Sequence, residues 1–129
     1  MSDNKAYLTG IASEYLVLSM LYRRKAEAFL SMGNKKAVDI LILQEDGTYI
    51  EVDVKSVLRS SSVPVDNIEA KDNRFVVFEN IEILPEFYIV PSKEVVATCY
   101  HSPQGLKRIH PRKHIAGYRD RWDLITDPE

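Results

Sequence analysis

Apolar residues recur at alternating spacings of three and four between residues 6 and 24, which is the pattern of one face of an α-helix. This stripe consists of Leu8, Ile11, Tyr15, Leu18 and Tyr22. Further apolar residues widen it, namely Leu16, Val17, Met20 and Leu21. The pattern therefore predicts a helix over residues 6–24 that is buried on more than one side.

Strand patterns follow this helix. Short segments rich in β-branched and aromatic residues cover residues 26–32, 37–44, 48–55, 75–79 and 87–90. Residues 56–72 lack a regular pattern and are predicted to be irregular. Ser92 is a typical N-cap residue, with Glu94 in the first turn, and it predicts a helix over residues 93–100. A last short helix is predicted over residues 116–125.

The order of these elements is a helix, three strands, an irregular link, two strands and a helix. Such an order predicts an α/β (α+β) fold in which a mixed β-sheet is flanked by helices. The length of 129 residues suits one domain with a single core, so a single domain over residues 1–129 is expected.

The strand over residues 48–55 carries three ionisable groups on one face. Successive side chains of a strand point to opposite faces, so Glu51, Asp53 and Lys55 share one face and the intervening apolar residues share the other. A charged, exposed edge strand would explain this pattern without any function. Asp39 adds weight to a functional interpretation, because a free carboxylate near the start of the preceding apolar strand is costly when buried.

The loop between these two strands decides whether the aspartates meet. A two-residue turn at Asp46 and Gly47 would place Asp39 and Asp53 on opposite faces of the sheet. A three-residue loop that begins at Glu45 would place them opposite each other on the same face. Such loops commonly end in a left-handed residue, usually glycine, and Gly47 stands at that position. The apolar residues of both strands then also share one face, so the three-residue loop is predicted.

Two facing carboxylates repel each other unless a positive charge compensates them. A hard divalent cation such as Mg²⁺ binds one or two carboxylates and keeps its other positions for water and phosphate oxygens. Lys55 adds a positive group that could orient or deprotonate a water molecule, or balance charge on a phosphate. Asp39, Asp53 and Lys55 therefore predict a phosphate-directed metal site. The alternative is a structural salt-bridge cluster of the same three residues without a metal.

Composition narrows the class of protein. The formal net charge of −2 argues against a surface that is basic throughout. Residues 107–121 nevertheless hold six Lys or Arg residues and one acid, a local charge of +5, which leaves −7 for the rest. Lys107, Arg108, Arg112 and Lys113 in this segment are candidates for contacting a phosphate backbone, or else form a solvated loop and helix end. A single cysteine excludes an intrachain disulfide. The chain has no apolar run long enough to span a bilayer and no signal-peptide pattern, so a cytoplasmic location and no membrane partner are expected.

A known motif matches these residues. Val38-Asp39 at the start of one hairpin strand, followed by Asp53-Val54-Lys55 on the next, resembles the signature of the PD-(D/E)XK nucleases, with Val38 in place of the proline. In members of the Holliday-junction-resolvase type, a glutamate of an N-terminal helix completes the metal site. Glu14 resembles that residue, and the resemblance covers about residues 6–100.

This resemblance implies a restriction-endonuclease-like fold and a Mg²⁺-dependent DNA endonuclease that hydrolyses phosphodiester bonds with a metal-activated water. It implies metal binding by Asp39, Asp53 and Glu14, with Lys55 as a further catalytic residue and Mn²⁺ as an alternative ion. It also implies a nucleic-acid substrate, most simply DNA, and a homodimer.

Two other functions are consistent with the sequence. The acidic net charge is compatible with a nuclease-fold protein that has lost catalysis and serves as an accessory or nucleic-acid-binding module. A charged edge strand on an unrelated α+β domain is the third hypothesis, and it requires Asp39 and Asp53 on opposite faces of the sheet.

Overall fold

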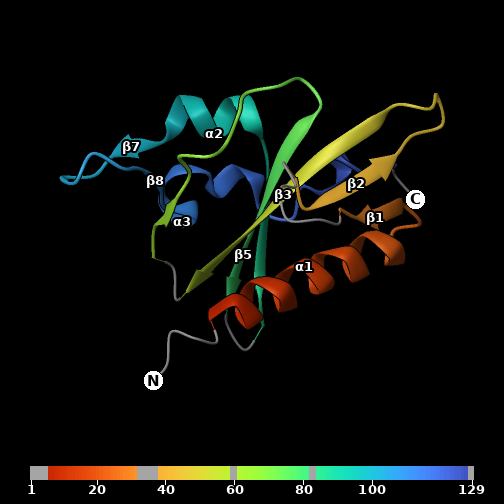
Figure 1. Ribbon diagram of the computed structural model, residues 1–129, viewed down its shortest axis with the longest axis horizontal. Coiled ribbons are helices and arrows are strands. Elements are labelled where there is room, and N and C mark those ends of the chain that lie inside the picture. The colour runs from red at the N-terminus through yellow and green to blue at the C-terminus, as the bar shows by residue number, and fades with distance from the viewer. Residues whose placement is uncertain (1–5, 32–37, 59–60, 82–83, 128–129) are drawn as a thin grey trace.

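The computed structural model describes residues 6–31, 38–58, 61–81 and 84–127. Helix α1 (Ala6–Arg23) is followed by strand β1 (Glu27–Leu30), as predicted for both. The remaining strands of the main sheet are β2 (Ile40–Leu43), β3 (Tyr49–Leu58), β5 (Arg74–Ile81) and β6 (Glu86–Pro91). Their order is β1-β2-β3-β5-β6, with β3 and β5 parallel and the other neighbours antiparallel. The predicted mixed sheet flanked by helices is therefore confirmed (Figure 1).

The β2–β3 hairpin has the three-residue loop that the sequence predicts. Ile40 pairs with Val52, and beyond the strand end the Gln44 amide donates to the Thr48 carbonyl at 2.9 Å. Gly47 has a φ of +88°, in the left-handed region that favours glycine. The paired register ends at Ile40 and Val52, and the Asp39 carboxylate just beyond it reaches the Val54 amide next to Asp53.

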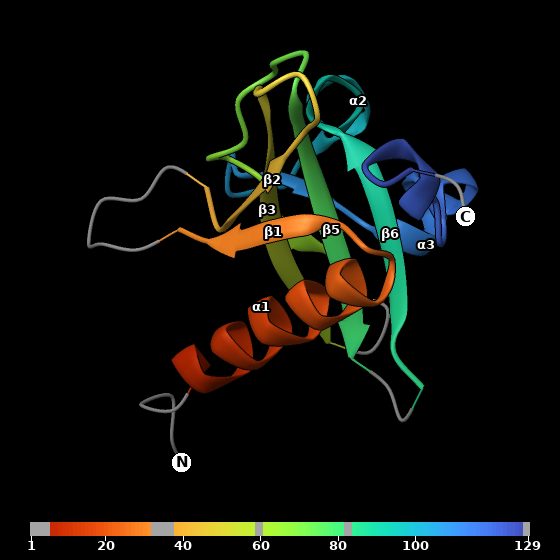
Figure 2. The same cartoon turned by 90° about the vertical axis from the view of Figure 1, so that its right-hand side faces the viewer.

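Helix α1 covers one face of the sheet. The side of the helix that packs on the sheet is not the apolar stripe that the sequence predicts as its buried face. The buried helix residues are Ser13, Val17, Leu18 and Leu21. Of the five stripe residues only Leu18 is buried, and the other four are exposed. The prediction of burial on more than one side is therefore wrong, because the sheet forms a single wall and nothing in the described chain covers the outside of α1 (Figure 2).

The other face of the sheet is covered by smaller elements. Helix α2 (Ser92–Thr98) packs on β5 and β6, beside a small sheet of β4 (Val63–Pro64), β8 (Lys107–Ile109) and β7 (Tyr100–His101). The predicted N-cap Ser92 is instead the first residue of α2, and its hydroxyl bonds with the backbone N–H and carbonyl of Lys71. Two buried clusters result, one on each face of the sheet, with Val52 in the first and Val76 in the second.

The C-terminal segment differs from the predicted helix over residues 116–125. It contains α3 (Pro111–His114) and two 3₁₀ helices, Ala116–Tyr118 and Trp122–Leu124. Asp120 between them has a φ of +55°, which a continuous α-helix cannot contain. Trp122 is buried against Phe87. Among the described helices, none is both long and apolar enough to cross a membrane.

Candidate metal centre

Strand β3 positions the ionisable residues through its alternation. Val52 belongs to the core beneath α1, whereas Val57 belongs to the core on the opposite face of the sheet. Glu51, Asp53 and Lys55 share the parity of Val57, so they point away from α1. The strand also runs past β2, which pairs only with its residues 49–52, while β5 pairs with residues 51–58. The candidate site therefore lies where the pairing of β2 with β3 ends and β3 continues beside β5.

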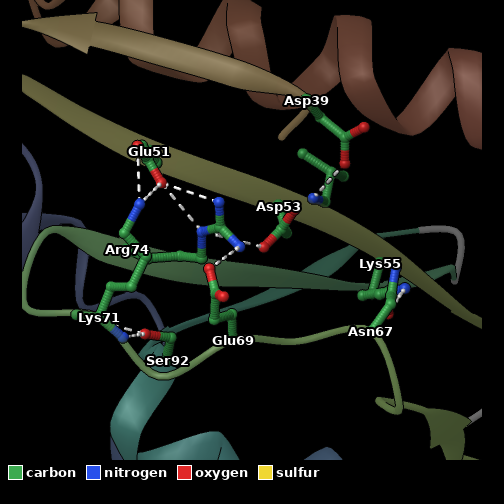
Figure 3. A network of polar contacts seen from close by, with 10 residues as sticks. Asp39, Glu51, Asp53, Lys55, Asn67, Glu69, Lys71, Arg74 and Ser92 are labelled. Atoms are coloured by element: carbon green, nitrogen blue, oxygen red, sulfur yellow. Dashed lines mark hydrogen bonds and ion pairs between the residues drawn. The ribbon is translucent and has the colours of Figure 1, made fainter. Parts of the chain in front are cut away.

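Asp39 lies at this point of divergence. Its backbone N–H donates to the Val52 carbonyl at 3.0 Å, although Val52 is the register partner of Ile40, so the regular pairing of the two strands ends here. Its carboxylate Oδ2 then accepts the Val54 N–H at 2.8 Å. A side chain thus satisfies a β3 amide beyond the end of β2, and the bond fixes the direction of the Asp39 carboxylate (Figure 3).

Asp53 is a buried carboxylate with little compensation. The residue is 7% exposed, and its Oδ2 has no hydrogen-bond partner. Among the described residues, the Arg74 guanidinium lies within ion-pair distance, with Nε at 4.0 Å from Oδ2, which is too long for a hydrogen bond. Burial raises the pKa of Asp53 to about 6; Arg74 and Lys55 lower the pKa, and Asp39 and Glu51 raise it further.

Glu51, two residues away on the same face, is fully compensated. The Arg74 guanidinium donates to its Oε1 from Nη2 at 2.8 Å and from Nε at 3.0 Å, and the Lys71 ammonium lies at 3.2 Å. These hydrogen bonds and charges outweigh the partial burial and hold the pKa of Glu51 below its ordinary value. Arg74 therefore directs its hydrogen bonds to Glu51 and leaves Asp53 with a longer contact.

Sequence reasoning missed Arg74 and Lys71. The residue pattern predicts a strand that begins one residue later, at Phe75, and so leaves Arg74 outside the strand. In the parallel pairing of β3 and β5, Glu51 is the direct partner of Arg74. The local signal for it is an arginine directly before a strongly apolar strand, and its pairing with Glu51 follows only from the structure.

Lys55 is held by Asn67 rather than by an aspartate. Its ammonium donates to Asn67 Oδ1 at 2.9 Å, and within the described chain it has no hydrogen bond to Asp53. A salt-bridge cluster in which Lys55 ties both aspartates together does not describe this arrangement. The ammonium instead lies beside the carboxylates and lowers the pKa of Asp53 from there.

Glu14 lies on α1, next to Ser13, which accepts a hydrogen bond from Ser56 of β3 at 2.6 Å. Asp53 points to the opposite face of β3. Accordingly, among the residues that the structure describes, no three His, Cys, Asp or Glu side chains are grouped closely enough to hold a metal ion. The expected set of Glu14, Asp39 and Asp53 is therefore not assembled as three ligands, while Asp39 and Asp53 are brought together.

The donor chemistry at Asp39 and Asp53 fits a hard divalent cation. Two carboxylates interact unfavourably at the site, and one of them has a buried oxygen with no hydrogen bond. An oxygen of this kind would gain from a cation that takes carboxylate ligands and leaves other positions to water. We conclude that the pair fits Mg²⁺ or Mn²⁺ in chemical character.

The four basic residues that the sequence predicts as phosphate contacts fall into two groups. Arg112 makes two hydrogen bonds to Glu86, at 2.9 and 2.6 Å, and these lower the pKa of Glu86 to about 2. Arg108 donates to the hydroxyl and carbonyl of Ser62. Both arginines thus have structural contacts, whereas Lys107 and Lys113 are exposed.

Solved structures define the class of fold. The chain has the PD-(D/E)XK nuclease-like fold, as the motif around Asp39, Asp53 and Lys55 predicts. The bacterial homing endonuclease I-Ssp6803I is similar with a TM-score of 0.70 and 22% identity, over 97% of this chain and 92% of the endonuclease. The Holliday junction resolvase Hjc of Archaeoglobus fulgidus is similar with a TM-score of 0.54 and 16% identity, over 85% and 87% of the two chains. Neither a protein-family model nor a curated protein sequence matches the chain.

Proposed function

We propose that this protein is a divalent-metal-dependent DNA endonuclease. Its active site, formed by Asp39, Asp53 and Lys55, hydrolyses phosphodiester bonds. The observation that carries the proposal is the buried carboxylate of Asp53, whose Oδ2 has no hydrogen bond in the described part of the chain and whose charge interacts unfavourably with that of Asp39, on a fold shared with a homing endonuclease and a junction resolvase. Buried groups with perturbed pKa values are concentrated at functional sites.

The three residues have separate roles. Asp39 and Asp53 would hold the ion, and the Val54 N–H keeps the Asp39 carboxylate oriented. A bound Mg²⁺ or Mn²⁺ polarises a phosphodiester and lowers the pKa of a coordinated water. Lys55, positioned by Asn67, supplies positive charge where negative charge builds up on the phosphate in the transition state. Glu51 accepts the hydrogen bonds of the Arg74 guanidinium, which therefore makes only the longer contact to Asp53 and leaves this carboxylate available to an ion.

Cleavage of plasmid, branched and single-stranded DNA tests this proposal. Wild type is compared with Asp53→Asn and Lys55→Met, each with Mg²⁺, with Mn²⁺ and with a chelator. We expect losses of at least about 10³-fold for Asp53→Asn and about 10²-fold for Lys55→Met. Glu45→Gln, in the exposed hairpin loop, is the matched control and should cleave like wild type. Cleavage that survives both substitutions would refute the proposal.

The second candidate is an accessory protein that binds nucleic acid without cutting it. The acidic net charge and the lack of a three-ligand group within the described residues favour it. Titration calorimetry separates the two functions. The endonuclease proposal expects Mg²⁺ binding by wild type that Asp53→Asn abolishes. Wild type that binds DNA but no divalent ion would identify the accessory function instead.

A further inference from the structure

The outer side of α1 carries an apolar seam that the fold does not use. Leu8, Ile11, Tyr15 and Tyr22 are 47%, 43%, 58% and 53% exposed. Together with Leu18 at its margin, they follow alternating spacings of three and four residues. This spacing is the heptad pattern of a helix that packs along another helix, whereas of these residues only Leu18 belongs to the core beneath α1. We refer to these five residues as the α1 seam.

The composition of the seam also differs from that of an ordinary surface helix. A helix that packs on one side of a sheet usually presents charged residues to solvent. Of the 18 residues of α1, only Glu14 and Arg23 are charged. Ala12 and Ser19 are exposed between the seam residues, and such small side chains let a second backbone approach closely. An apolar exposed patch of this kind marks an interaction surface.

The seam is also held in shape. The Tyr22 hydroxyl donates to the Ala28 carbonyl of β1 at 3.0 Å, which fixes the ring at one end of the seam. The helix itself is anchored by Val17 and Leu21, both fully buried beneath it. A partner would therefore meet a rigid surface and would lose little conformational entropy in ordering it.

We infer that the α1 seam binds the seam of a second copy of this chain, with the two helices antiparallel about a two-fold axis. A two-fold contact requires a surface that is complementary to itself, and an uncharged seam pairs with its own copy without repulsion. Tyr15 lies midway between Leu8 and Tyr22, seven residues from each. Antiparallel pairing therefore sets the Tyr15 rings of the two copies together at the axis and each Leu8 near the other copy's Tyr22.

The available area indicates how stable this pair would be. The exposed seam presents on the order of 500 Å² per copy, if each aromatic ring contributes roughly 100 Å² or more. A pair would then bury about 1,000 Å² in total, near the lower limit of specific interfaces. We therefore expect a dimer that dissociates on dilution.

Pairing through α1 leaves the candidate metal centre open. By the alternation of β3, Asp53 and Lys55 share the face of Val57, which is the face of the sheet opposite α1. Association can therefore be measured independently of DNA cleavage, and the inference stands or fails without regard to the proposed endonuclease activity.

Sedimentation velocity over about 1 to 500 µM provides the first test. Wild type should shift from one chain of 14.8 kDa towards twice that mass as its concentration rises. Tyr15→Arg should remain monomeric throughout. Phe29→Arg is the matched control, because Phe29 is 50% exposed on the opposite face of the main sheet, and this variant should dimerise like wild type. Circular dichroism melts should be similar for all three proteins, since neither ring is buried.

Complementary charges provide the second test. Tyr15→Glu and Tyr15→Lys should each be monomeric alone, and an equimolar mixture should recover dimers, because the two positions meet at the axis. Wild type that stays monomeric at the highest concentration would overturn the inference. Dimers of Tyr15→Arg, or a mixture that remains monomeric, would also overturn it.

Discussion

Glu51 and Asp53 are two carboxylates of the same strand, two residues apart and on the same face, yet their surroundings differ sharply. Glu51 accepts hydrogen bonds from Arg74 and Lys71, and its pKa is lowered. Asp53 is more buried, has an oxygen with no hydrogen bond, and its pKa is raised to about 6. Arg74 could serve either group, and its hydrogen bonds go to Glu51.

The difference separates an acid that holds a buried arginine from the acid that we propose as a metal ligand. The charge of Glu51 is needed to keep a buried arginine in place, whereas the charge of Asp53 makes the unliganded protein less stable. A group that costs stability and is not neutralised from within is suited to an external cation. Two substitutions test this contrast, and a third tests the hairpin loop that positions the two strands.

The largest effect on stability is expected from Glu51→Gln. The substitution removes the carboxylate that accepts two hydrogen bonds from the buried Arg74 guanidinium, and a buried charge without its partner is strongly destabilising. Glu51 is partly exposed, so we expect a loss of about 2–3 kcal/mol in the free energy of unfolding. Urea unfolding measures it, with Glu45→Gln as the exposed control. A loss no larger than that of the control would show that Arg74 does not depend on Glu51.

Asp53→Asn should act in the opposite direction, and its effect should depend on pH. The pKa of Asp53 is about 6 in the folded protein, whereas the ordinary value of 3.8 applies to the unfolded chain. The folded state therefore binds the proton more tightly, and this contribution to stability is present below about pH 4 and is lost as the pH rises through 6. At pH 7.5, without divalent ions, the asparagine variant should be more stable than wild type by about 2 kcal/mol.

The pH profile provides the check on this prediction. The difference between the two proteins should shrink as the pH falls through 6 and approach zero below about pH 4, where wild-type Asp53 becomes protonated in both states. Thermal unfolding at several pH values in the presence of a chelator measures the difference. An asparagine variant that is less stable than wild type at pH 7.5 would mean that Arg74 compensates Asp53 more fully than the 4.0 Å separation suggests.

Gly47→Ala should have the smallest effect. The φ of +88° at Gly47 is strained for any residue with a side chain, and a Cβ would meet nothing within 4 Å, so the cost is conformational alone. We expect a loss of about 1 kcal/mol in urea unfolding. Gly117→Ala is the control, because Gly117 also has open space but no positive φ, and it should change stability little. Equal effects of the two substitutions would argue that the loop does not set the hairpin register.

Local chemistry made the hairpin predictable. The glycine at the third loop position fixes the register of β2 and β3, and the Asp39 carboxylate then reaches the Val54 amide next to Asp53, so the closeness of the two aspartates could be inferred from the residue pattern. Strands β5 and β6 were also predictable, because they are largely buried and rich in apolar residues.

Other features depended on contacts between distant segments. The sequence contains two adjacent apolar faces on α1, and only the position of the sheet decides that Val17 and Leu21 are buried while Tyr15 is exposed. Arg74 meets Glu51 through a parallel pairing whose register no local signal reveals. Serine is a common helix N-cap residue, but the Ser92 hydroxyl instead forms hydrogen bonds with the backbone N–H and carbonyl of Lys71. These contacts join residues that are far apart in the sequence, and local residue patterns do not predict such contacts.

The bond between the Val54 amide and the Asp39 carboxylate has a spectroscopic consequence. An amide proton that is held by a carboxylate, instead of by a neighbouring strand, senses every change in the charge of that carboxylate. In a ¹⁵N-labelled sample, the Val54 resonance should therefore shift when a divalent ion is added. Its solvent exchange should slow at the same time, although the backbone around it keeps its position. One backbone signal would then report directly on occupancy of the centre, without any need for a nucleic acid.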